Sequence, residues 1–253
     1  MLEFTEIEIE EDEVSERLIK SKSRVQKHGE VFTPRWMVKI MLDQPEVKKA
    51  CNELETTFLE PAAGEGVFLV EILRRKLKMV SKKFNGTLKQ YENYALLALT
   101  TIYGIELLED NAQICTQNLF EIFSDMYSDQ ILYHSGKKSR KVTESAKVII
   151  SANIAQGNFL TQEASDGKDI VFSEWYPNYR KNSIDVVRTE YTLTEILEKK
   201  AKAKGLMYSK KEKPLQISFF DSPENQEELL RQYKYFCVPI VDVYKEETEV
   251  YDG

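Results

Sequence analysis

The sequence predicts an α/β protein built on a doubly wound parallel sheet, and two observations carry that prediction. First, a short apolar run at Phe58–Leu59 ends at Glu60, enters the turn Pro61–Gly66 and leads into a helical apolar pattern. Second, strand and helix patterns alternate through residues 58–175. A glycine turn after the first strand of such a sheet lies where nucleotide-like ligands bind, because no side chain separates backbone and ligand.

Composition sets the broad class of protein. The chain has 253 residues, of which 42% are hydrophobic and 11% aromatic, so a core can form, and its net charge is -7. The acidic balance does not indicate a nucleic-acid partner, although local basic patches decide that question. The three scattered cysteines predict neither a disulfide framework nor a metal site. No signal peptide or membrane-length apolar run is visible, so we expect a cytoplasmic protein.

We expect the chain to divide into an N-terminal arm and helical segment over residues 1–57 and an α/β domain over residues 58–253. The part after about residue 176 either completes the sheet or forms a C-terminal insertion. A helix should span residues 35–42, capped by Thr33 with Pro34 at its first position. The other expected elements are an acidic edge strand or loose arm over 1–14, strands at 102–107, 148–160, 169–172, 215–220 and 236–243, and helices at 88–99, 193–204 and 224–234.

Three further segments fit one binding site with the glycine turn. Glu106 ends the second strand, where an acid accepts hydrogen bonds from ribose hydroxyls. Asn158 and Phe159 follow the third strand and offer an amide and a ring that suit adenine. Upstream, Gly29–Pro34 precedes a helix start, and helix N-termini favour anions. Each segment alone has an ordinary structural explanation, but together they favour a ligand site.

In this order the segments resemble those of the S-adenosylmethionine-dependent DNA adenine-N6 methyltransferases, especially the modification subunits of type I restriction-modification systems. In that family a G-x-x-[FY]-T-P segment precedes the first strand, as Gly29–Pro34 does. The family motif [DE]-P-A-[AC]-G-[ST]-G corresponds to Glu60–Gly66, with Glu65 where Ser or Thr is usual. The acid after the second strand corresponds to Glu106, and G-[DN]-F-L to Gly157–Leu160.

The resemblance covers roughly residues 27–175 and implies a Rossmann-like class I methyltransferase sheet with S-adenosylmethionine as cofactor. The upstream segment and the glycine turn would hold the methionine end, the acid the ribose, and the last segment the adenine. The implied cofactor-binding residues are Phe32, Thr33, Glu60, Pro61, Ala62, Gly64, Glu106, Asn158 and Phe159.

The catalytic motif of that family, [DNS]-P-P-[YFW], is absent, because no two of the 7 prolines are adjacent. In the family this motif holds the target amine and stacks on a base flipped out of the duplex. The corresponding place is Ser173–Tyr176, where Glu-Trp replaces the two prolines, so Ser173 and Tyr176 are the candidate catalytic residues. Asp221–Pro223 is a less favoured alternative.

Three functions stay open from the sequence. The chain could methylate DNA adenine, alone or with a specificity or restriction subunit that reads the DNA. It could instead be a catalytically inactive cofactor-binding or interaction module of a restriction or phage-defence complex. The third reading is a methyltransferase that acts on a non-DNA amine. Basic residues at 136–141 and 199–213 are candidate phosphate contacts, and no membrane partner is expected.

Overall fold

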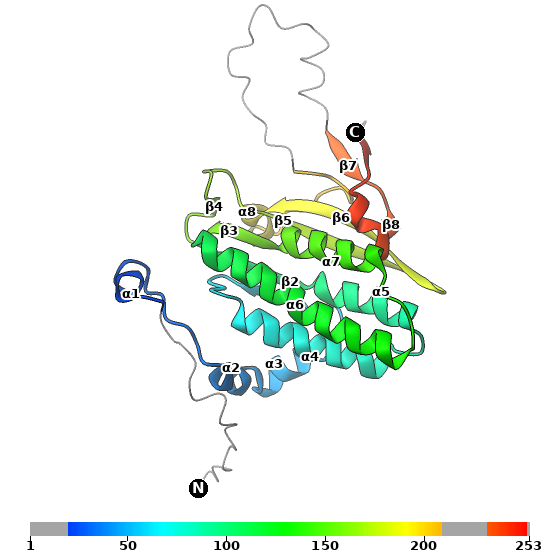
Figure 1. Cartoon of the computed structure of the whole chain (residues 1–253). Coiled ribbons are helices and arrows are strands. Elements are labelled where there is room, and N and C mark those ends of the chain that lie inside the picture. Colours follow the sequence, from blue (N-terminus) through cyan, green and yellow to red (C-terminus); the bar gives the residue numbers. More distant parts are fainter. Residues whose placement is uncertain (1–19, 209–231, 252–253) are drawn as a thin grey trace, which may run out of the picture.

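The computed structural model of the protein describes residues 20–208 and 232–251 (Figure 1). Its helices are α1 Lys22–His28, α2 Arg35–Leu42, α3 Pro45–Cys51, α4 Val67–Lys83, α5 Leu88–Leu99, α6 Glu109–Tyr133, α7 Arg140–Asn153, α8 Leu193–Leu197 and the short 3-10 helix η2 Ile240–Lys245. Its strands are β1 Phe58–Glu60, β2 Ile102–Glu106, β3 Ile154–Asn158, β4 Glu163–Ala164, β5 Val171–Arg180, β6 Ser183–Thr192, β7 Tyr233–Tyr235, β8 Val238–Pro239 and β9 Thr248–Val250.

The central sheet has four strands in the order β1-β2-β3-β4. The first three strands are parallel, with Phe58 beside Ile102 and Gly104 beside Ile154, and β4 is antiparallel to β3. Parallel neighbours need a crossover, and here the crossovers contain helices α4 to α7. The predicted α/β fold is therefore confirmed, with a mixed sheet of parallel strands and helices.

The side chains of β2 alternate between two cores. Ile102 belongs to the large core, and a Cβ on Gly104 would lie 2.8 Å from a methyl of Leu69, so only glycine allows α4 this close. Ile105 belongs to a small core with Phe172 and Leu193. The sheet is thus covered by helices on one face and by residues of β5 and α8 on the other.

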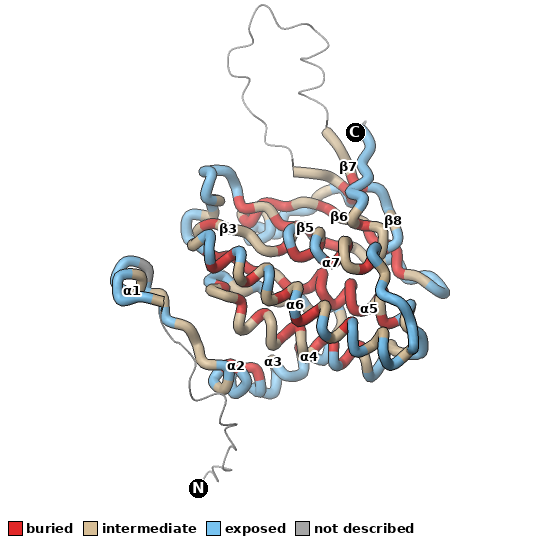
Figure 2. Tube along the Cα trace, in the orientation of Figure 1, coloured by how far each residue is buried: buried red, intermediate tan, exposed pale blue. Residues whose placement is uncertain are grey.

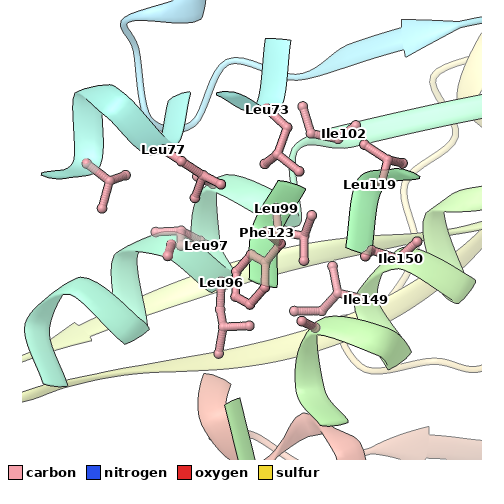
Figure 3. Close-up of a cluster of buried hydrophobic side chains, with 14 of the residues drawn as sticks. Leu73, Leu77, Leu96, Leu97, Leu99, Ile102, Leu119, Phe123, Ile149 and Ile150 are labelled. Carbon is pink, nitrogen blue, oxygen red and sulfur yellow. The ribbon is translucent and has the colours of Figure 1, made fainter. Parts of the chain in front are cut away.

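The large core is built by the inner faces of helices α4 to α7. Figure 2 shows buried residues recurring along these helices, and Figure 1 shows α4, α5 and α6 side by side. Apolar residues at three- and four-residue spacing produce such a face, and full burial of each leucine contributes about 1.5–3 kcal/mol. The side chains labelled in Figure 3 are Leu73, Leu77, Leu96, Leu97, Leu99, Ile102, Leu119, Phe123, Ile149 and Ile150.

The N-terminal helices share this core. Helix α2 spans the predicted residues, and its Val38 and Leu42 are buried in the large core together with Cys51 of α3. The predicted cap is wrong. Pro34 occupies the N-cap position, and no side chain, Thr33 included, caps the helix.

The strand expected over 169–172 is present only from Val171, and it does not join the parallel sheet as that prediction implied. Strand β5 begins at Val171 and runs through residues 173–176 to Arg180, antiparallel to β6, with β8 on the other side of β6. Strand β5 pairs with β6 at each position from Val171 to Arg180, so the chain extends into a hairpin of two ten-residue strands instead of turning after Phe172. A separate pair is formed by β7 and β9.

Other element predictions differ at their ends. The helix predicted over 88–99 is confirmed as α5, whose cap residue Thr87 accepts a hydrogen bond from the Gln90 amide at 3.1 Å. The strand expected from residue 148 begins only at Ile154, because α7 continues to Asn153. The helix expected over 193–204 ends at Leu197, and the strand expected over 236–243 consists of β8 followed by η2.

Some predictions fall on residues that the structure does not describe. These are the arm over 1–14, the strand over 215–220, the alternative catalytic segment Asp221–Pro223 and residues 224–231 of the helix expected over 224–234. Of the rest of that helix, Gln232 is not helical and residues 233 and 234 belong to β7. Within residues 20–208 and 232–251, no helix combines the length and the apolar character that a membrane span requires.

Candidate functional site

The glycine turn joins β1 to α4, as the sequence predicts. Gly64 and Gly66 have φ values of 56° and 86°, a region that residues with a side chain rarely adopt. At Gly66 a Cβ would also lie 2.6 Å from the Cys115 sulfur of α6. The turn is therefore held close against α6 at a position where only glycine fits without strain.

Glu106, at the end of β2, fixes the shape of this turn. The side chain is 7% exposed, and its carboxylate accepts hydrogen bonds from the Gly64 amide at 2.7 Å and the Leu108 amide at 2.9 Å. Asn118 of α6 donates to the Glu65 carbonyl at 2.9 Å. The acid is thus placed at the carboxyl end of the parallel strands, with the turn backbone around it.

A cavity of about 380 Å³, called the cradle here, lies between the glycine turn and the segment before α2. Its lining includes Phe32, Thr33, Glu60, Ala62 and Gly64, all of them predicted cofactor-binding residues. The remaining lining residues are Val31, Arg35, Ala63, Glu65, Val67 and Phe68. The structure therefore brings five predicted residues, from two separate segments, to one cavity.

Arg35 of the cradle was missed by sequence reasoning. It is the first residue of α2, where a cation opposes the helix dipole. A cation at this unfavourable helix position is the sequence signal that could have identified Arg35 as a site residue. The cradle thus contains one basic side chain and two acidic ones, Glu60 and Glu65.

Ion pairs from α1 and from Lys20, two residues before it, hold the upstream segment near the turn. Lys20 contacts Glu65 at 2.9 Å, and Arg24 contacts Glu30 at 2.5 Å and Asp110 of α6 at 2.9 Å. Hydrogen bonding from Arg24 lowers the pKa of Asp110 to about 2 and also lowers the pKa of Glu30. Both carboxylates therefore remain charged, and the network persists, at neutral pH.

The other predicted cofactor residues do not line the cradle. Pro61 is part of the turn but does not line the cavity. Glu106 does not line it either, and contacts the turn by accepting a hydrogen bond from the Gly64 amide. Asn158 ends β3 and accepts a hydrogen bond from the Leu160 amide at 2.9 Å. Phe159 packs against the small core. Asn158 and Phe159 thus make ordinary turn and core contacts, at the end of the strand that pairs with β2.

Ser173 and Tyr176 lie inside β5 and line a second cavity of about 500 Å³. The Ser173 side chain is 1% exposed, and its hydroxyl accepts a hydrogen bond from Arg188 at 2.8 Å. The Tyr176 hydroxyl donates to Glu174 at 2.6 Å, and burial together with this bond raises the pKa of Tyr176. No residue lines both cavities, although the neighbours Leu59 and Glu60 of β1 each line one.

The two basic stretches have different neighbours. Lys141, in the stretch at 136–141, pairs with Asp242 at 2.9 Å. Lys199, Lys200, Lys202 and Lys204, in the described part of the stretch at 199–213, line the second cavity. Among the described residues, no group of three or more His, Cys, Asp or Glu side chains is arranged to hold a metal ion.

Comparison with known proteins adds no relative. No protein-family model matches the chain, and neither a curated protein nor a solved structure matches it. The geometry of the site itself is therefore what indicates function.

Proposed function

We propose that the protein binds S-adenosylmethionine in the cradle and is methyltransferase-like, of the DNA adenine-N6 type, acting as an enzyme or as a subunit of a restriction-modification system. One observation carries this proposal. The segment containing Phe32 and Thr33 and the turn containing Glu60 and Gly64 enclose a single cavity, with the strand-end acid Glu106 bonded to the turn.

The chemistry of the cradle fits the methionine end of this cofactor. Its volume of about 380 Å³ lies in the range of small-molecule sites. The Glu60 carboxylate suits the ammonium group and the Arg35 guanidinium suits the carboxylate. One Glu106 oxygen accepts from the Gly64 amide of the turn and the other from the Leu108 amide just after β2, so an acceptor position on each oxygen remains for ribose hydroxyls.

When bound, the cofactor supplies an electrophilic methyl group that an amine nitrogen can take up, with loss of a proton from that nitrogen. The chain's own residues orient the donor: the glycine turn brings the backbone close, and Glu60 and Arg35 fix its polar end. The two residues expected to hold the acceptor amine already have protein partners. The Ser173 hydroxyl accepts a hydrogen bond from Arg188, and the Tyr176 hydroxyl donates one to Glu174.

That acceptor geometry favours a second candidate function, a cofactor-binding or interaction module without catalysis. A methyltransferase acting on a non-DNA amine is the third reading. All three candidate functions require S-adenosylmethionine, so cofactor binding is tested first and methyl transfer second.

Calorimetry with S-adenosylmethionine and S-adenosylhomocysteine tests the cradle. We expect micromolar binding to the wild type and a loss of at least tenfold in Glu106→Ala, because the turn loses the acceptor of its Gly64 amide. Glu109→Ala removes the same charge from an exposed position three residues away and should bind as wild type does. Absence of binding by the folded wild type would refute the cofactor proposal.

Transfer of labelled methyl groups to duplex DNA then separates the candidates. Methylated adenine in the product supports the enzyme. Cofactor binding without transfer to DNA, alone or with candidate specificity and restriction subunits, favours the module. Transfer to protein or small amines in the same assay supports the third reading.

A further inference from the structure

Strand β1 is an edge strand of the central sheet. The strand order β1-β2-β3-β4 gives it one neighbour, β2. Phe58 faces that neighbour, since its amide donates to the Thr101 carbonyl at 2.9 Å. Alternate residues of a strand direct their backbone groups to opposite sides, so the amide and carbonyl of Leu59 point outward. Among the residues that the structure describes, none pairs with this outer side of β1.

The outer edge also carries exposed side chains. Thr57 and Leu59 are exposed, and Leu59 is exposed to 42%. An uncovered edge is a ready template for a strand from another chain. Strand β1 has only three residues, and Pro61, which has no amide, follows one residue after Leu59 and Glu60. The edge therefore pairs with a short segment, and firm binding requires further contacts from side chains.

The second cavity supplies a place for such contacts. Thr57, Phe58 and Leu59 all line it, so it borders the edge strand directly. Its lining also includes Tyr103 and Phe172, whose rings meet edge to face with centroids 5.6 Å apart. In strand addition, backbone hydrogen bonds give affinity and pockets beside the edge select side chains. A cavity of about 500 Å³ with aromatic walls selects an aromatic side chain.

Lysines beside the same cavity determine the charge of the partner. Four lysines between residues 199 and 204 line the cavity, against two acids. Lys200 and Lys202 each pair with a glutamate of this chain at 2.5 Å. No carboxylate in the described part of the chain forms an ion pair with Lys199 or Lys204. Since the whole chain has a net charge of -7, this local positive charge favours an acidic partner.

We propose that the outer edge of β1 binds an extended segment of another protein, in which an aromatic residue has an acidic residue two positions away on each side. Residues two apart lie on the same side of a strand, so this spacing directs the ring and both carboxylates toward the cavity. The segment pairs its backbone with Leu59, inserts the ring into the second cavity and places its carboxylates near Lys199 and Lys204. This interaction goes beyond the proposed cofactor function and does not depend on it.

Fluorescence anisotropy with labelled heptapeptides tests the spacing. The probe is Thr-Glu-Thr-Phe-Thr-Glu-Thr with both ends blocked. Its control, Thr-Thr-Glu-Phe-Glu-Thr-Thr, has the same composition and charge but directs both acids to the side opposite the ring. The probe should bind at least fivefold more tightly than the control, and at least tenfold more tightly than a version with lysine in place of glutamate. Equal affinity of the three peptides would overturn the proposal.

Backbone methylation tests the pairing itself. Two versions of the probe are N-methylated on alternate amides, so that each version blocks one side of the strand. Only one side of a paired strand faces its neighbour, so one version should lose binding at least tenfold while the other binds within twofold of the probe. Equal losses in both versions would refute pairing at an edge.

A substitution in β1 locates the pairing on this protein. Leu59→Pro removes the outward amide at a position where an edge strand tolerates proline, and it should weaken the probe at least fivefold. Leu59→Val retains the amide and should bind within twofold of the wild type. Unchanged binding by a Leu59→Pro variant that thermal melting shows to be folded would contradict the assignment to β1. If that variant does not fold, the methylated peptides still decide whether a strand is paired.

The lysines are tested by a matched pair of double variants. Lys199→Ala combined with Lys204→Ala should weaken the probe at least fivefold. Lys78→Ala combined with Lys82→Ala removes the same charge from exposed positions on α4 and should not weaken it. Equal affinity of the two double variants would overturn the acidic character of the partner.

Two other occupants of the edge give distinct results. The chain's own N-terminal sequence contains Phe4 with Glu6 two positions later. A gain in probe affinity of at least fivefold in Phe4→Ser with Glu6→Ser would assign the edge to this sequence and overturn the proposal. A dimer of the wild type that Leu59→Pro abolishes would assign it to a second copy, with the same consequence. Glu106→Ala should leave probe binding intact while weakening the cofactor, so this proposal and the cofactor proposal fail independently.

Discussion

Gly66 is the N-cap of α4 and directly follows the turn residues Gly64 and Glu65 that line the cradle. It combines a left-handed backbone with contact against Cys115, whose thiol is buried and has its pKa raised to about 12 by that burial. The thiol therefore packs as a small neutral apolar group. Any side chain at residue 66 would have to displace α6 as well as strain the backbone.

Gly66→Ala should lower the free energy of unfolding by about 3 kcal/mol, from backbone strain plus overpacking. The matched control is Gly167→Ala, because Gly167 has a φ of 75° but nothing within 4 Å of the added Cβ. That control should cost only about 1 kcal/mol. Urea denaturation measures both, and equal losses would show that the Cys115 contact does not matter.

At the scale of single residues, the sequence was enough to predict the positions of the glycine turn and of Glu106 at the end of its strand, because both follow from local rules. A strand, a glycine turn and a strand-end carboxylate need no tertiary information. The hydrogen bond from Gly64 to Glu106 joins residues 42 positions apart, and no local pattern indicates it. The packing of Phe159 against the small core is likewise a tertiary fact.

Among the elements, the β5–β6 hairpin determines where the predicted catalytic residues lie. Arg188 of β6 is its main cross-link: it donates to Ser173 at 2.8 Å, to Glu190 at 2.9 Å and to Glu246 at 2.8 Å. Its guanidinium also lies 4.5 Å from the centre of the Tyr235 ring. One side chain thus joins β5 and β6 to the C-terminal segment with β7 and η2.

Arg188→Met should loosen the C-terminal segment and cost about 2 kcal/mol, because Ser173 and Glu190 lose a charged partner whose side chain is only 14% exposed. Hydrogen exchange should become faster in β7 and β9 while α4 stays protected. Arg180→Met is the control, since Arg180 pairs with Asp185 on the same hairpin but its side chain is 60% exposed. Identical exchange in both variants would contradict the cross-linking role.

The predicted element boundaries are wrong where tertiary packing overrides local preference. Ile149 and Ile150 are β-branched, yet they are buried in the large core as part of α7, and this packing keeps the chain helical to Asn153. Residues 171–180 form a partly exposed strand, but which partner they pair with cannot be read from one strand alone. Helices α2 and α5 were predictable because their apolar spacing is regular.

For the whole molecule, Lys76 links stability to pH. This α4 side chain is fully buried, donates to the carbonyls of Glu53 and Leu54 at 2.7 and 3.1 Å, and lies over the Phe58 ring. Burial lowers the pKa of Lys76 to about 8. Between that value and the unfolded pKa of about 10.4, the unfolded chain binds a proton that the folded chain lacks, so stability from this group rises with pH.

Comparison of wild type with Lys76→Met isolates this contribution, because other titrating groups cancel in the difference. The stability of the wild type relative to the variant should increase by about 2 kcal/mol between pH 7 and pH 9.5. Denaturant unfolding at both pH values measures the change. A difference that stays constant with pH would contradict the lowered pKa.

The ion pairs of α1 also make the shape of the cradle depend on the salt concentration. Arg24 and Asp110 have side chains that are 26% and 48% exposed, so added salt can screen their attraction. The Debye length falls from about 8 Å at physiological ionic strength to about 3 Å at 1 M. Concentrated salt should therefore release the segment before α2 and widen the cradle. Ionic strength would then regulate this cavity through a helix that does not line it.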